Sequence, residues 1–237
     1  TWLLFFSFSN QVKAQDESSV NHDLKSLIIQ TDSLLGADDE LINGKIYIQE
    51  NLLAEGHPFF LSPNWQPGNV VINGKKHEGL FLKYNLYTDE LVLKAERKKG
   101  GAAVISINNE FVESFDLENR HFVNSMNFNV KGIQTDFVEL LYEGNFVFFV
   151  SYSKAFNNDY NIKTPYGSYG KTKTSYFLLQ NSKLNSISSK KTLLKYFESD
   201  KKKIKKFMKI NKIKYAKASY DQLQHLMQYC DELSKDQ

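Results

Sequence analysis

Short runs of alternating apolar and polar residues fill the middle of the chain and predict β-strands. The runs recur about every 8 to 12 residues, a spacing typical of consecutive antiparallel strands. Between 70–72 and 80–86 lies Asn73-Gly74, a pair that favours the positive φ angles of a two-residue turn and therefore predicts a hairpin. The remaining predicted strands are 45–49, 91–95, 102–107, 111–117, 122–128, 137–142, 146–152 and 176–179.

The spacing of apolar residues changes to a helical period on both sides of this segment. An amphipathic helix is predicted over 18–35. Near the other end, three helices with serine N-caps at Ser188-Ser189 and Ser219 are predicted over 190–197, 200–211 and 220–233. The expected fold class is mainly β: an antiparallel meander, as a curled sheet, barrel or sandwich, with an N-terminal helix and a helical C-terminal region.

The first fourteen residues have the pattern of the end of a signal peptide. An apolar run over 2–6 is followed by Val12-Lys13-Ala14, which suits signal-peptidase cleavage before Gln15. We therefore expect export to the periplasm or to the periplasmic face of the outer membrane. The expected organisation is a signal remnant (1–14), an N-terminal helix and linker (15–42), an antiparallel β domain (43–188) and a basic helical region (189–237).

Positive charge is concentrated near one end of the chain. Residues 190–217 contain twelve lysines against Glu198 and Asp200, a local net charge of +10, so the rest of the chain sums to −7 for a total of +3. Such a region can be a solvated helix face or a binding surface. The residues expected to meet a partner are Lys201, Lys202, Lys205, Lys206 and Lys209. For an exported protein, an acidic protein surface, anionic lipid or lipid A is expected as the partner, and nucleic acid is not.

Two loops are rich in aromatic residues. The first contains 56–60 (Gly-His-Pro-Phe-Phe) and Trp65; His57 and Trp65 can bind a glycan by hydrogen bonding and stacking, or the aromatics can plug one end of the β-core. The second, over 159–175, carries Tyr160, Tyr166 and Tyr169 among Gly, Ser and Lys, a composition typical either of binding loops or of a mobile hairpin tip.

Sequence motifs for catalysis and for cofactors do not occur. The chain lacks a Gly-x-Ser-x-Gly elbow, a His-Glu-x-x-His motif, paired cysteines, a phosphate-binding loop and a dinucleotide fingerprint. No cofactor or metal is therefore expected, and no enzymatic activity is indicated. The single cysteine, Cys230, falls on an apolar helix face and is expected to be a buried packing residue.

The chain resembles a group of uncharacterised secreted proteins of Bacteroidota, of the flavobacterial type. The resemblance rests on 56–60 with Trp65-x-x-Gly68, on Val71-x-Asn73-Gly74 leading to 82–85 and Asp89-x-Leu91, and on the helices over 191–211. It implies a location in the periplasm or at the inner face of the outer membrane and no particular activity. Two hypotheses follow: a non-enzymatic accessory subunit of an outer-membrane protein assembly, or a glycan-binding or glycan-active periplasmic β-protein.

Overall fold

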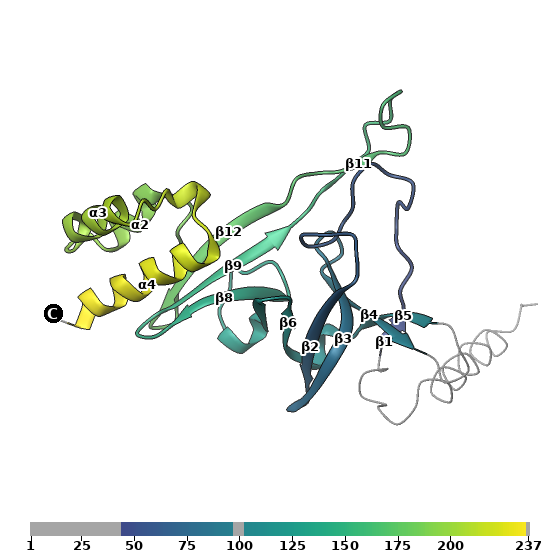
Figure 1. Ribbon diagram of the computed structural model, residues 1–237, viewed down its shortest axis with the longest axis horizontal. Helices are drawn as coiled ribbons and strands as arrows, with labels where there is room; N and C mark the ends of the chain where they lie inside the picture. Colours follow the sequence, from purple (N-terminus) through teal and green to yellow (C-terminus); the bar gives the residue numbers. More distant parts are fainter. Residues whose placement is uncertain (1–43, 97–101, 236–237) are drawn as a thin grey trace, which may run out of the picture.

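The computed structural model describes residues 44–96 and 102–235, and these form one large antiparallel β-sheet with a helical region at one end (Figure 1). The eleven strands lie in the order β1-β5-β4-β3-β2-β6-β7-β8-β9-β12-β13, and a separate two-stranded sheet pairs β10 with β11. The strands are β1 (Gly44–Ile46), β2 (Gln66–Ile72), β3 (Lys75–Asn85), β4 (Glu90–Glu96), β5 (Ala102–Ile107), β6 (Val112–Leu117), β7 (Arg120–Asn124), β8 (Phe137–Glu143), β9 (Val147–Ser153), β10 (Phe156–Asn157), β11 (Ser168–Tyr169), β12 (Lys173–Gln180) and β13 (Lys183–Ser186).

The mainly β, antiparallel fold predicted from the sequence is confirmed. Of the three predicted forms, the described residues adopt an open sheet, since its edge strands β1 and β13 do not pair with each other. The predicted signal remnant at 1–14 and the helix over 18–35 lie outside the described residues.

The Asn73-Gly74 turn forms as predicted. Ile72 pairs with Lys75, which leaves only these two residues in the loop. Asn73 and Gly74 have φ angles of 49° and 76°, the left-handed conformation that a two-residue turn of this kind requires.

Two predicted strands end earlier than expected: β1, predicted to reach residue 49, ends at Ile46, and the strand predicted over 122–128 is also cut short. β7 ends at Asn124, and Ser125–Phe128 forms a 3₁₀ turn, η2, instead of continuing the strand. The Asn124 side chain accepts a hydrogen bond from the Met126 N–H, which caps this turn. The local bond offers the backbone an alternative to the strand ladder.

Two hydrophobic clusters lie on the same face of the sheet. The first is formed mainly by β2 to β7, and the second by β8, β9 and β12 together with the helices. Phe122 of the first cluster pairs with Glu139, and Glu139 pairs with Val150 of the second. Residues directly opposite each other in antiparallel strands point to the same side, so the two clusters are neighbours along one continuous surface.

The three predicted C-terminal helices are confirmed as α2 (Lys190–Tyr196), α3 (Lys201–Ile210) and α4 (Tyr220–Lys235). Ser189 caps α2 in a capping box with Thr192. Ser219 does the same at α4: its hydroxyl accepts from the Gln222 N–H at 3.3 Å, while the Gln222 side chain accepts from the Ser219 N–H. The helices cover the second cluster, and α4 packs against β8.

Candidate functional sites

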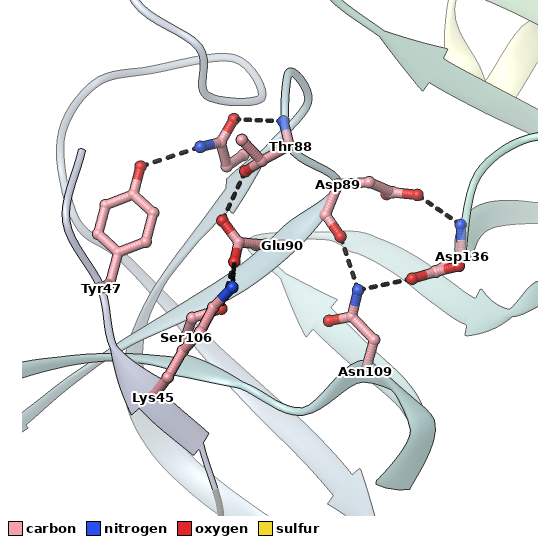
Figure 2. Close-up of polar contacts among 9 residues, drawn as sticks. Lys45, Tyr47, Thr88, Asp89, Glu90, Ser106, Asn109 and Asp136 are labelled. Carbon is pink, nitrogen blue, oxygen red and sulfur yellow. Dashed lines mark hydrogen bonds and ion pairs between the residues drawn. The ribbon is translucent and has the colours of Figure 1, made fainter. Parts of the chain in front are cut away.

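A polar cluster surrounds the turn between β3 and β4 (Figure 2). It draws side chains from β1 and the residue after it, from the end of β3 through the turn to the start of β4, and from β5, the 3₁₀ turn η1 (Asn109–Phe111) and the segment before β8. The residues involved are Lys45, Tyr47, Asn85, Thr88, Asp89, Glu90, Ser106, Asn109 and Asp136. Five separate parts of the chain therefore meet here.

Glu90 is held as a carboxylate by three donors. The Thr88 hydroxyl donates to Oε2 at 2.6 Å, the Ser106 hydroxyl donates to Oε1 at 3.0 Å, and Lys45 Nζ lies 2.8 Å from Oε1. Burial acts to raise the pKa of Glu90, but these contacts outweigh it and place the pKa below its usual value. Glu90 is therefore an ionised anchor for Lys45.

Asp89, unlike Glu90, has a carboxyl pKa above its usual value. Its backbone is left-handed, with a φ of 58°. Burial raises the pKa of its carboxyl group, against the lowering effect of hydrogen bonds from the Tyr84 hydroxyl and the Asp136 N–H, both at 2.5 Å. Asn109 Nδ2 donates to the Asp89 carbonyl and to the Asp136 carboxylate at 2.6 and 2.8 Å, and so links the two acidic residues.

A cleft of about 590 Å³ opens beside this cluster, lined by Glu90, Asp136, Asn109 and their neighbours. Internal donors engage all three carboxylates of the cluster. The cluster therefore fastens β1 and the β3–β4 turn to the rest of the sheet.

The lysines predicted as a partner surface lie on α3, and four of them share one face. Lys202, Lys205, Lys206 and Lys209 are exposed and spaced at i, i+3, i+4 and i+7, which places them on one side of a helix. We call these four residues the lysine face. None of them forms an ion pair within the described residues. Lys201 is half-buried and, one turn before Lys205, lies at the edge of this face.

The opposite side of α3 fixes the helix to the molecule. Ile204 and Met208 are 0% and 2% exposed, as the apolar spacing predicts. Phe207 is half-buried and stacks on Tyr229 of α4, with ring centroids 4.1 Å apart and planes 9° apart. Asn211, which the same spacing also places on the buried face, is exposed.

The three predicted binding tyrosines have different surroundings. Tyr160 and Tyr166 are 66% and 56% exposed. Tyr169 is half-buried: its hydroxyl donates to the Glu50 carbonyl at 2.7 Å, and its ring packs against Tyr87 and Phe156. Tyr169 therefore supports the loop, and only Tyr160 and Tyr166 are available to a partner.

Of the predicted glycan-binding pair, Trp65 lies against a lysine and His57 lies against Phe59. Lys83 Nζ lies 4.6 Å from the ring centroids of both Trp65 and Phe59, so an ammonium group occupies one face of Trp65. His57 stacks on Phe59, and its Nδ1 is buried without a hydrogen-bond partner among the described residues. Burial, together with the charges of Lys154 and Lys83, lowers the pKa of His57.

The aromatics of this loop plug the end of the sheet. Phe59 and Phe60 are 2% and 3% exposed, and Phe60 packs edge-on against Phe122 in the first cluster. Lys154 Nζ donates to the carbonyls of His57 and Phe59 at 2.8 and 3.1 Å, which ties the loop to the end of β9. These contacts favour the structural interpretation of the loop over a glycan site.

A buried ion pair lies between the two hydrophobic clusters, and sequence patterns did not predict it. Arg120 Nε and Nη2 donate to the two carboxylate oxygens of Glu139, a residue that is 0% exposed. The Tyr152 hydroxyl donates to Glu139 Oε2 at 2.6 Å. The Arg120 guanidinium also lies 5.0 Å from the ring centroid of Tyr220, the first residue of α4.

The charge of Glu139 raises the pKa values of both of its partners, Arg120 and Tyr152. Burial acts to lower the pKa of Arg120, but the hydrogen bonds and charge of Glu139 outweigh it and raise that pKa. Burial and the Glu139 charge raise the pKa of Tyr152. The only sequence signal for the site was that Arg120 is one of two arginines among thirty basic residues, a bias equally expected from an A+T-rich genome.

Comparison with known proteins found no matching family model, no similar curated protein and no similar solved structure. Over 44–96 and 102–235, no set of three or more His, Cys, Asp or Glu side chains is grouped as metal ligands would be. In the same ranges, no helix has both the length and the apolar character needed to span a bilayer.

Proposed function

We propose that the protein is a non-enzymatic interaction protein of the bacterial cell envelope, acting as an accessory subunit that binds an acidic partner protein through the lysine face of α3. The observation that carries this proposal is the set of four exposed lysines on one helix face without ion pairs in the described residues. Lysines spread for solubility alone need not share a face. Complementary charge of this kind speeds and orients protein association.

The attachment of α3 supports the same proposal. Ile204, Met208 and the Phe207–Tyr229 stack hold the helix against the second cluster, so the four ammonium groups project from a rigid support. Ile210, which is 67% exposed and lies one turn after Lys206, is the one exposed apolar residue that α3 carries. Membrane-bound amphipathic helices need an apolar face to insert, which α3 instead uses for packing. A protein surface therefore suits the lysine face better than a lipid bilayer.

The test is co-purification from native envelope membranes, with partners identified by chemical cross-linking. Replacing Lys202, Lys205, Lys206 and Lys209 by Gln should leave unfolding unchanged within about 0.5 kcal/mol, because exposed substitutions rarely cost more. Recovery of the cross-linked partner should nevertheless fall, and recovery by the unaltered protein should fall as salt rises.

The matched control removes the same number of charges elsewhere. The control variant carries Gln at four exposed lysines outside α3 and outside the β10–β11 loop, namely Lys131, Lys183, Lys190 and Lys217. It should retain the partner as the unaltered protein does. Equal retention by both four-Gln variants, or retention that does not respond to salt, would show that the lysine face is an ordinary solvated surface.

A further inference from the structure

The loop between β10 and β11 ends in three exposed apolar side chains. Tyr160, Ile162 and Tyr166 are 66%, 102% and 56% exposed, so Ile162 makes essentially no contact with the rest of the described molecule. We call these three residues the apolar tip. In Figure 1 the loop projects from the top of the molecule, beyond the label of β11 and away from the helices.

The tip is held in a defined conformation. Asn161 Oδ1 accepts hydrogen bonds from the N–H groups of Lys163 and Thr164 at 2.9 and 3.2 Å, and Asn161 Nδ2 donates to the Thr164 hydroxyl at 2.8 Å. The Thr164 hydroxyl in turn donates to the Asp159 carbonyl at 2.9 Å. None of these bonds uses a side chain of the apolar tip.

Strand pairing, ring packing and backbone hydrogen bonds hold the base of the loop in place. Phe156 pairs with Tyr169 across β10 and β11, and both rings pack with Tyr87. Backbone bonds join Glu55 to Gly167 and Tyr169 at 3.1 and 2.9 Å. An ordered base and an ordered turn therefore hold two tyrosines and an isoleucine out into solvent, where they gain no burial from this fold.

We propose that the apolar tip inserts into the interfacial region of an anionic lipid bilayer. Tyrosine is favoured at the headgroup level, where its ring is apolar and its hydroxyl stays hydrated, and Ile162 between the two tyrosines can reach the acyl chains. Residues 159–173 carry three lysines against Asp159, a net charge of +2, which complements anionic headgroups. A projecting loop can insert into a lipid bilayer because the bilayer is fluid and deforms around it.

This inference is independent of the lysine face, because it concerns a different loop and a different partner. To keep them separate, vesicle binding is measured with the full chain carrying Gln at Lys202, Lys205, Lys206 and Lys209. The probes are phosphatidylcholine vesicles with and without phosphatidylglycerol. Sedimentation should show binding to the mixed vesicles, weaker binding to pure phosphatidylcholine, and at least a tenfold loss when Tyr160, Ile162 and Tyr166 are all replaced by Ser.

The matched control is Met126→Ser, which removes an apolar side chain that is 72% exposed on η2; it should bind vesicles as the parent does. Insertion itself is read from a polarity-sensitive dye attached to Ile162→Cys, since the natural Cys230 is 0% exposed. The dye emission should shift to the blue with mixed vesicles, whereas a dye at Met126→Cys should not shift. Absence of vesicle binding, equal binding by the triple Ser variant, or no shift at position 162 would each overturn the proposal.

Discussion

Arg120 of β7 and Glu139 of β8 form a bidentate ion pair between the two hydrophobic clusters of the sheet. Glu139 also accepts the Tyr152 hydroxyl, and Arg120 lies against Tyr220 at the start of α4. The pair thus links the β-sheet to the helical region. Desolvation offsets much of the attraction within a buried pair, so its main effect is expected when one partner is removed.

Arg120→Met should destabilise the protein by about 3 to 5 kcal/mol, because it leaves the carboxylate of Glu139 buried without its counter-ion. The double variant Arg120→Met with Glu139→Leu should recover most of that loss, since both charges are then absent. Urea unfolding of the two variants measures the difference. A double variant no more stable than Arg120→Met would contradict the assignment of the loss to the unpaired carboxylate.

Glu90→Gln should lower the unfolding free energy at pH 7 by about 1.5 to 3 kcal/mol, the range for hydrogen bonds to charged groups. The folded-state pKa of Glu90 lies below its usual value, so its stabilising effect is complete above the unfolded-state pKa. That effect is lost as pH falls through the folded-state pKa. Denaturant unfolding from pH 7 to pH 3 should show the two proteins converging in acid; a constant difference would argue against the depressed pKa.

The three helices and most strands followed from the sequence because each depends on local chemistry, but β10, β11 and β13 were not predicted. The Asn73-Gly74 turn, the caps at Ser189 and Ser219 and the buried Ile204 and Met208 can all be read from neighbouring residues. Local pattern did not determine how far β7 extends, since the cap at Asn124 ends it early.

The polar contacts could not be predicted in the same way. Asp89 and Asp136 are 47 residues apart, and Lys154 and His57 are 97 apart; only the strand order brings them together. Trp65 and His57 looked available in the sequence, but Lys83 and Phe59 occupy the space beside them. The exposure of Tyr160 and Tyr166, against the packing of Tyr169, likewise depends on the pairing of β10 with β11.

Gly68 lies where the central strands β2, β3 and β6 pack too closely for a side chain. A Cβ at this position would collide with the backbone carbonyl of Asp116 on β6 and lie 2.7 Å from Leu82 Cδ1 on β3. Gly68→Ala should therefore cost more than Gly79→Ala, where φ is +68° but no atom lies within 4 Å of the added carbon. The second change should cost only about 1 kcal/mol of backbone strain. Thermal unfolding of both variants makes the comparison, and equal losses would contradict the predicted collision.

Cys230 should be unreactive in the folded protein. It is 0% exposed, and burial raises the pKa of its thiol to about 12, with smaller effects from Asp200 and Asp231. The thiolate is the reactive form, so modification by a thiol reagent should be slow in buffer and fast in denaturant. Cys230→Ala should cost on the order of 1 kcal/mol without affecting partner binding. Rapid labelling in buffer would indicate that α4 opens from the sheet.

The ladder between β9 and β12 has a mechanical consequence. Seven residue pairs run without a bulge from Leu179–Val147, near the helices, to Lys173–Ser153, near the apolar tip. At about 3.4 Å per residue this is a stiff span of about 20 Å, with α3 beyond one end and the tip beyond the other (Figure 1). Two weak contacts held at a fixed separation raise each other's effective concentration only if both can be reached at once. If both proposed contacts form, their combined avidity depends on the distance between the acidic partner and the bilayer.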